Sequence, residues 1–204
     1  DFLAQQARRH GIWLVGGTLP LEAPEPDRVM NSVLVYGPAG ERVARYDKIH
    51  LFRFTKGDET YDEARTIAPG SAVSTFVFAP AGGPRITVGL SVCYDLRFPE
   101  LYRGMGTLAL ILVPAAFTAT TGAAHWHLLL RARAVENQCY MLAAAQGGEH
   151  PGGRRTYGHS VLIDPWGVIV AERDDGPGIV VGDVDPARIK AVRAELPALA
   201  HRVF

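Results

Sequence analysis

The stretch that decides the fold is residues 85–103, which read RITVGLSVCYDLRFPELYR. Its first half, Arg85 to Val92, is an apolar run with β-branched residues and predicts a buried strand. Its second half predicts a turn that enters a short helix. Cys93 stands at the junction, where α/β enzymes present a nucleophile beside free backbone N–H groups. A free cysteine is more often a small buried hydrophobe, so the neighbouring segments decide whether Cys93 has a chemical role.

The composition favours a globular enzyme over a nucleic-acid or membrane protein. The 204 residues suit a single α/β domain, and 48% of them are hydrophobic. Lys and Arg number 21, as do Asp and Glu, so no basic excess indicates nucleic acid or an anionic membrane as a partner. The longest apolar run, 108–117, is broken by Pro114 and is too short to span a bilayer. Two cysteines make no disulfide framework, which favours a reducing, cytoplasmic setting.

Hydrophobic periodicity predicts strands that alternate with a few helices, the pattern of an α/β sandwich. Helices are expected at 1–10, 99–103, 122–137 and 186–195. Strands are expected at 12–15, 32–36, 42–46, 75–78, 85–92, 108–113, 140–145, 159–163, 168–171 and 179–181. The Pro-rich segment 19–28 is expected to be a loop. The segment 51–72 is expected to be long and irregular, a property of functional or disordered segments, and to border an active-site mouth.

Three residues with chemical potential follow predicted strands. Lys48 comes directly after one strand, Glu63 lies in the long segment 51–72, and Cys93 ends the strand 85–92. Because strand ends can meet at the same edge of a sheet, we expect these side chains to converge. A lysine next to a cysteine favours the thiolate form.

Several motifs around these residues occur in a characteristic order: YDKIHLF at 46–52, SVCYDLRFPEL at 91–101, PAAF at 114–117, TG at 121–122, HW at 125–126, LLRARAVENQ at 129–138, YGHS at 157–160 and DPWG at 164–167. In these motifs the chain resembles the nitrilase, or carbon–nitrogen hydrolase, superfamily. The resemblance covers essentially all 204 residues apart from the Pro-rich loop. It implies an αββα sandwich whose dimers pack into a larger layered assembly.

The resemblance also implies the reaction. A small carboxamide would be hydrolysed to an acid and ammonia through a thioester on Cys93, without a metal or an organic cofactor. Lys48 would favour the thiolate and stabilise the oxyanion. Glu63 would orient Lys48 and assist proton transfer; its rival is Glu59, and only the local match to Glu-x-x-Thr-x-x-Pro-Gly favours Glu63. The backbone N–H of Tyr94 would be the second oxyanion donor.

Other polar residues receive less specific expectations. The resemblance places Phe117 and Thr118 with Tyr94 at the oxyanion and substrate-binding border. Arg97 and Glu100 are expected to form an ion pair at a helix start, and Glu136 to have a structural role. His125 and His127 are two residues apart on a helix and point to different sides, so no shared metal is expected there. His159 is expected to be a hydrogen-bonded core histidine.

One departure from the family pattern concerns the general base. The family uses a glutamate after an early strand, and no residue of this chain matches it, since Glu22 and Glu25 lie in the Pro-rich loop. We therefore expect that the 204 residues form one hydrolase domain that lacks the family's first strand and is inactive alone. The base and that strand would then lie upstream of Asp1 or on a separate chain.

The run LLRARAVENQCY to AAAQ at 129–146 looks most like the deaminated glutathione amidase branch. Omega-amidase is the runner-up, and nitrilase and N-carbamoyl hydrolase activities remain alternatives. A non-catalytic binding module and an acyl-transferring relative also remain open. The partners expected are a small amide and a second copy of the chain. The largely apolar segment 196–204 would pack on that copy in a homodimer or higher oligomer.

Overall fold

A small sheet is organised around β2 (Val29–Tyr36), in which Val33 and Val35 are fully buried. In the computed structural model, which describes residues 1–203, β1 (Leu14–Glu22) and β3 (Arg42–Asp47) flank β2 in antiparallel pairing. The short β6 (Ile67–Ala68) pairs parallel with the start of β2. The predicted strands 32–36 and 42–46 are thereby confirmed, and they pair as a hairpin that forms the centre and one edge of this sheet.

The helix α1 (Phe2–His10) covers the outer face of the small sheet. Its buried Ala7 packs against Leu34 and Tyr36 of β2. Gly11 ends the helix in the left-handed conformation with a φ of 60°, which glycine adopts without a steric cost.

A larger, six-stranded sheet has the order β14-β13-β10-β9-β8-β7. Its strands are β7 (Ser74–Phe78), β8 (Ile86–Leu90), β9 (Leu110–Ala115), β10 (Tyr140–Ala145), β13 (Ser160–Ile163) and β14 (Ile169–Arg173). The three central strands are parallel, and the outer ones are antiparallel to their neighbours. Parallel neighbours need a crossover, and helices supply it here.

These crossovers are α2 (Pro99–Gly104) and α3 (Ala119–Asn137), which cover the outer face of the large sheet. Trp126, Leu130 and Ala134 of α3 are fully buried against the sheet, as the helical spacing predicts. The last helix, α4 (Pro186–Glu195), coincides with its prediction and begins with a cap in which Asp185 accepts a hydrogen bond from the Ala187 N–H.

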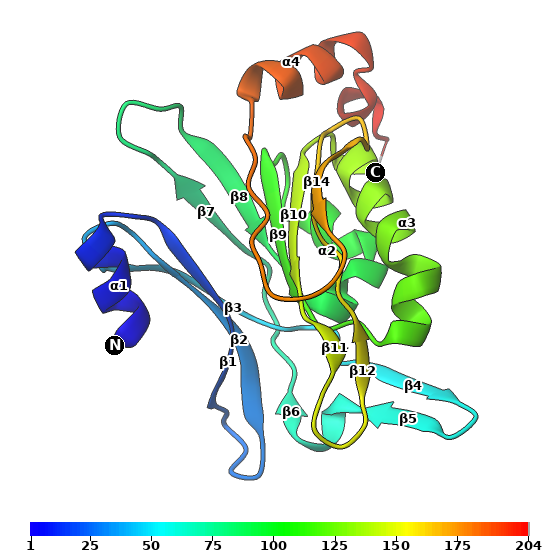
Figure 1. The fold of residues 1–204 in the computed structure, drawn as a ribbon. Helices are drawn as coiled ribbons and strands as arrows, with labels where there is room; N and C mark the ends of the chain where they lie inside the picture. Colours follow the sequence, from blue (N-terminus) through cyan, green and yellow to red (C-terminus); the bar gives the residue numbers. More distant parts are fainter. Residues whose placement is uncertain (204) are drawn as a thin grey trace.

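The two sheets pack face to face. Val33, Val35 and Tyr46 of the small sheet share one buried cluster with Val88 and Leu90 of the large sheet. From α1 to α3 the layers are therefore helix, sheet, sheet and helix (Figure 1), so the expected αββα sandwich is confirmed.

Two hairpin arms project from the same end of the sandwich (Figure 1). The first arm, residues 53–62, consists of β4 (Arg53–Lys56) and β5 (Glu59–Asp62) and leads into the short helix η1 (Glu63–Arg65). The second arm, residues 147–157, consists of β11 (Gly147–Glu149) and β12 (Arg155–Tyr157). The prediction of an irregular segment 51–72 was wrong in this respect, and the sequence analysis missed the second arm.

Two further predictions were wrong. The expected loop 19–28 begins as strand, because β1 continues to Glu22 in register with Val29 of β2. The expected strand 179–181 is absent: Ile179 and Val181 are 84% and 75% exposed and pair with no neighbouring strand in the described chain. A β-branched composition alone is not sufficient where no strand is available for pairing.

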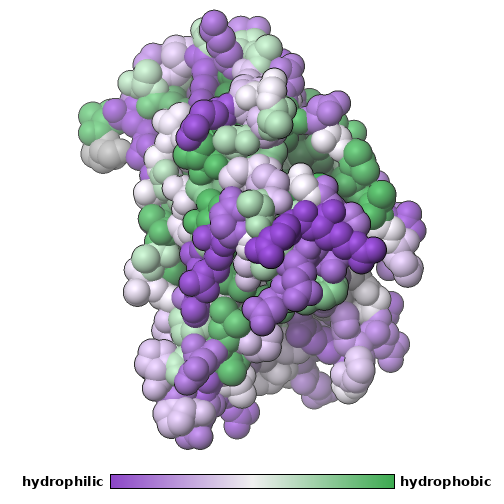
Figure 2. Space-filling model, turned by 90° about the vertical axis from the view of Figure 1, so that its left-hand side faces the viewer, coloured by the Kyte–Doolittle hydropathy of each residue, from purple (hydrophilic) through white to green (hydrophobic). Residues whose placement is uncertain are grey.

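The molecular surface agrees with the layer order. Figure 2 views the side that carries α1, and hydrophilic residues cover the centre of this face while hydrophobic ones gather toward its edges. Within residues 1–203, no helix has both the length and the apolar character needed to cross a membrane.

Candidate active site

Cys93 lies on a sharp turn between β8 and the short helix η2 (Cys93–Arg97), with a backbone φ of 50°. This left-handed conformation is uncommon for a residue with a side chain and is found at functional sites. Buried Asp95 holds the turn, since it accepts hydrogen bonds from the Val92 N–H at 2.9 Å and the Tyr46 hydroxyl at 2.7 Å. Asp95 therefore fixes the turn that carries Cys93 to the end of β3, a structural role that was not predicted from the sequence.

Lys48 follows β3 and is completely buried. Its ammonium forms an ion pair with Glu63. Its backbone is held on both sides: the N–H donates to Asn31 O at 2.9 Å and the carbonyl accepts from the Gly70 N–H at 2.8 Å. The direction of the Lys48 side chain is thus fixed by the small sheet and by the segment after η1.

Glu63 is fixed by the segment that follows Lys48. Its Oε2 accepts a hydrogen bond from the Phe52 N–H at 2.7 Å, and its own N–H donates to Phe52 O at 2.9 Å. The rival residue Glu59 accepts instead from the Thr120 hydroxyl at 3.0 Å. The structure thus brings Glu63, and not Glu59, to Lys48.

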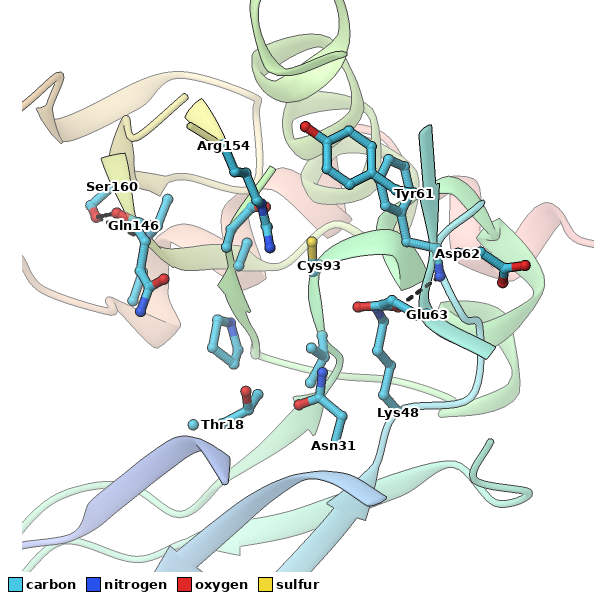
Figure 3. A pocket seen from close by; sticks show the side chains of 18 residues that line it. Thr18, Asn31, Lys48, Tyr61, Asp62, Glu63, Cys93, Gln146, Arg154 and Ser160 are labelled. Atoms are coloured by element: carbon cyan, nitrogen blue, oxygen red, sulfur yellow. Dashed lines mark hydrogen bonds and ion pairs between the residues drawn. The ribbon is translucent and has the colours of Figure 1, made fainter. Parts of the chain in front are cut away.

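Cys93, Lys48 and Glu63 line one cavity of about 540 Å³. Figure 3 shows Lys48 and Glu63 on one side of Cys93, with Arg154 directed toward Cys93 from another side. The wall comes from both sheets, from both arms and from the segment after β10; its other polar members include Thr18, Asn31, Tyr61, Asp62, Gln146 and Ser160. The predicted convergence of the three residues is therefore present, and their catalytic roles stay a prediction.

Opposing influences act on the Cys93 thiol. Burial raises its pKa above the ordinary value and outweighs the neighbouring positive charge of Lys48, which lowers it. A backbone hydrogen bond from Ala116 and the charge of Arg154 lower the pKa further, whereas the charge of Glu63 raises it. The thiol of the free protein is thus held mainly protonated, with a cation in place to stabilise the thiolate when it forms.

A second, much smaller pocket beside Cys93 is lined by Tyr94, Phe117 and Thr118. The Phe117 ring packs on Trp126 with centroids 4.8 Å apart. Thr118 caps α3, where its hydroxyl accepts from the Thr121 N–H at 3.3 Å. The last two side chains thus have structural contacts, and the substrate-binding role predicted for these three residues remains a prediction.

The expected ion pair between Arg97 and Glu100 is not among the ion pairs of residues 1–203. The Arg97 guanidinium lies over the rings of Tyr94 and Phe117 and contacts His125 Nδ1 at 3.3 Å. This expectation was wrong because the guanidinium stacks on two aromatic faces instead of pairing with the Glu100 carboxylate.

His127 and His159 form a cluster with Glu172 outside the cavity. His127 Nε2 and His159 Nδ1 each lie 2.7 Å from the same oxygen of Glu172. His159 is hydrogen-bonded, as expected, but it is half-buried and not a core residue. The ligand atoms of this group lie within 4.8 Å of one another, and the contacts connect α3 to β13 and β14. Glu136 pairs with Arg133 at 3.0 Å, which agrees with the structural role predicted for it.

Arg154 is the cavity residue that the sequence analysis missed most clearly. It lies between β11 and β12, after Gly152 and Gly153, where no apolar alternation marks a strand. Its position near Cys93 depends on the pairing of the second arm. Gln146 and Ala116 were also missed, although each enters the wall directly after a predicted strand, β10 and β9 respectively.

Comparisons with known proteins agree with this geometry. The model of the carbon–nitrogen hydrolase family matches residues 1–194. Deaminated glutathione amidase of Synechocystis sp. is 42% identical over 207 residues, which span 100% of this chain and 75% of that protein. Human omega-amidase NIT2 is 37% identical over 98% of this chain and 71% of its own length.

Solved structures agree with the family match. The NitFhit protein of C. elegans superposes with a TM-score of 0.85 at 38% identity, over 98% of this chain and 48% of that one. Nit3 of Saccharomyces cerevisiae, a nitrilase-superfamily member, has a TM-score of 0.83 at 34% identity, over 100% of this chain and 70% of that one. The fold, the paired lysine and glutamate beside the cysteine, and these matches lead to one conclusion: the chain belongs to the carbon–nitrogen hydrolase family.

Proposed function

We propose that the protein hydrolyses a small linear carboxamide to a carboxylic acid and ammonia, with Cys93 as the nucleophile. The observation that carries the proposal is the meeting of Cys93, Lys48 and Glu63 at one cavity. An amidase of the carbon–nitrogen hydrolase family is also what the named relatives indicate.

The first chemical step is attack of the Cys93 sulfur on the amide carbon. The carbonyl oxygen becomes an oxyanion, and the Lys48 ammonium stabilises it together with the backbone N–H of Tyr94. A donor of this kind contributes about 2.7–4 kcal/mol to the transition state. The carbon–nitrogen bond then breaks as the departing nitrogen takes up the proton released by the Cys93 thiol, so ammonia leaves and a thioester remains on Cys93.

Water completes the reaction by attacking the thioester, which releases the acid and returns the thiol. Glu63 holds the Lys48 ammonium beside the sulfur through their ion pair. The same pair assists the proton transfers, since both groups line the cavity in which the leaving ammonia and the attacking water must lie.

For the substrate, we propose an amide of the deaminated glutathione type, with omega-amides of short dicarboxylic acids as the second candidate. The support is the sequence identity, which is 42% to the deaminated glutathione amidase of Synechocystis sp. and 37% to human omega-amidase NIT2. A cavity of about 540 Å³ accommodates either class.

The test is ammonia release over a panel of amides, nitriles and carbamoyl compounds. The proposal expects turnover of deaminated glutathione or an omega-amide and none of nitriles. Turnover confined to carbamoyl compounds would refute the substrate class. Turnover that requires an added amine and yields a new amide would indicate acyl transfer, and binding without turnover would indicate a binding module.

We further propose that residues 1–204 act as one domain and assemble as a homodimer in a reducing, cytoplasmic compartment. Support for a dimer comes from exposed apolar side chains on α3 and on the turn before β14: Leu128, Val135, Trp166 and Val168. The segment after α4 is attached to its own chain, because Gln138 Nε2 donates to Leu196 O; Phe204, part of the predicted contact, lies outside the described residues. Light scattering that gives a monomer at micromolar concentration would contradict the assembly.

A further inference from the structure

The charges around the cavity leave Arg154 without an acidic partner. Lys48 is paired with Glu63, and the Asp62 carboxylate accepts from the Ala64 N–H at 3.2 Å and points away from Cys93 (Figure 3). None of the ion pairs formed by residues 1–203 includes Arg154. The cavity therefore presents an uncompensated guanidinium close to the cysteine.

The position of this guanidinium is set by neutral groups. Arg154 Nη2 donates to Ala116 O at 2.7 Å, and the guanidinium carbon lies 5.9 Å from the centre of the Tyr61 ring. Ala116 belongs to the cavity wall and also hydrogen-bonds the Cys93 thiol through its backbone. The loop after β9 thus places the cation and the nucleophile relative to each other, while most N–H donors of Arg154 stay free.

We propose that Arg154 binds a carboxylate of the substrate, so that the preferred substrates are amides with a negative charge at the end remote from the scissile bond. A planar guanidinium forms two parallel hydrogen bonds with a carboxylate, which fixes the substrate's direction as well as its charge. Arg154 and Cys93 line the same cavity, so one substrate molecule can reach both residues. This inference rests on the proposed amide hydrolysis and adds to it the residue that selects a charged substrate over a neutral one.

The competing explanation is that Arg154 only assists the thiolate or only supports the second arm. Support of the second arm would affect charged and neutral substrates equally, and a role confined to the charge beside the thiolate would be filled by lysine as well as by arginine. A carboxylate anchor instead discriminates between two substrates of the same size that differ in charge. The measurements must therefore compare such pairs.

The first measurement uses alkylation of Cys93, which needs no turnover. Iodoacetate and iodoacetamide have nearly the same size, and only iodoacetate carries a carboxylate. We measure both rates by mass spectrometry of the Cys93 peptide and divide each by the rate of a small free thiol. The proposal expects Arg154→Gln to lower the iodoacetate-to-iodoacetamide ratio by about tenfold. The matched control is Arg155→Gln, an exposed neighbour that is absent from the cavity wall, and it should leave the ratio unchanged.

The second measurement compares two forms of the amide that the enzyme turns over. One form carries the remote carboxylate, and in the other this carboxylate is a neutral methyl ester. Arg154→Gln should raise KM for the acid at least about tenfold and change kcat/KM for the ester less than about twofold. Arg154→Lys should recover part of the loss, because a lysine keeps the charge without the bidentate geometry.

The outcomes separate the inference from the proposed function. An unchanged alkylation ratio in Arg154→Gln, or an equal loss on acid and ester, would overturn the anchor even if the enzyme is an amidase. A tenfold fall of the ratio would support the anchor even if none of the amides tested is hydrolysed. In that case the proposed hydrolysis, and not the anion site, would have failed.

Discussion

Replacing Lys48 by Met removes the cation that the site places beside the thiol. Lys48 is completely buried and its ammonium contacts Glu63. Met has nearly the same length and keeps the packing of the aliphatic stem. The substitution therefore tests the charge with little change in volume.

The expected effect on catalysis follows from the oxyanion-donor role proposed for the ammonium. Loss of one such donor costs about 2.7–4 kcal/mol, or a factor of roughly 10²–10³ in kcat. Because the interaction forms in the transition state, kcat and kcat/KM should fall together. Alkylation of Cys93 at neutral pH should also slow, since Lys48 is the largest influence that lowers the pKa of this thiol.

The substitution should leave a folded protein. Glu63 loses its ionic partner, yet its carboxylate is 29% exposed and keeps the hydrogen bond from the Phe52 N–H. An incompletely satisfied charged group of this kind costs about 1–3 kcal/mol. Domains usually have about 5–15 kcal/mol of stability, so most of the protein stays native.

The assay is ammonia release at saturating and at limiting substrate, with circular dichroism as the folding check. Lys56→Met is the matched control, because Lys56 is an exposed lysine on β4 that is absent from the cavity wall. A Lys48→Met enzyme that keeps kcat and raises only KM would refute a transition-state role and make Lys48 a substrate-binding residue.

Three further predictions concern Glu63, Cys93 and Glu172. Glu63→Gln should lower kcat about 10²-fold while Glu59→Gln, on the Thr120 contact, changes it little; equal effects in ammonia release would contradict the assignment. Cys93→Ala should abolish turnover, and retained ammonia release would exclude the thioester. Burial raises the pKa of Glu172, but hydrogen bonds from two histidines outweigh it and lower the pKa. Glu172→Gln should thus lower the free energy of unfolding by up to about 1 kcal/mol at pH 7, and the difference from the unmodified protein should shrink as the pH falls from about 4.3 through the lowered folded-state pKa; a difference that stays constant with pH would refute this.

The sign of the Glu172 effect follows from its two protonation states. Its pKa in the folded protein lies below the value in the unfolded chain, so the ionised carboxylate stabilises the fold above the unfolded value. That contribution is lost as the pH falls through the folded-state pKa. The histidine contacts at 2.7 Å identify the interaction that protonation of Glu172 would remove.

Much of the sandwich was predictable because its core strands and helices repeat their apolar residues at the expected period. The helix α4 and the strand β10 coincide with their predicted ranges, and Trp126, Leu130 and Ala134 mark the buried face of α3. The meeting of Lys48 and Cys93 followed from their places at strand ends. These predictions depend on local pattern and on general rules of sheet packing.

The arms could not be predicted in this way. The strands β11 and β12 are short, and the segment between them contains Gly152 and Gly153 and no alternation of apolar residues. Their strand conformation comes from pairing with each other and from contact with α3, which is a tertiary effect. The opposite error occurred at 179–181, where β-branched residues lack a strand to pair with.

The cavity combines residues held by the core with residues held by the arms. Cys93 and Lys48 are fixed by buried contacts of the core, Asp95 on one turn and Asn31 on the neighbouring strand. Tyr61 and Arg154 belong instead to the two arms, and their mutual contact joins the arms across the cavity. Changes in the arms can therefore alter the charge and length of the substrate without disturbing the nucleophile. Substitutions on the arms should shift KM and the choice of substrate, whereas substitutions at the core turn should lower kcat for every substrate.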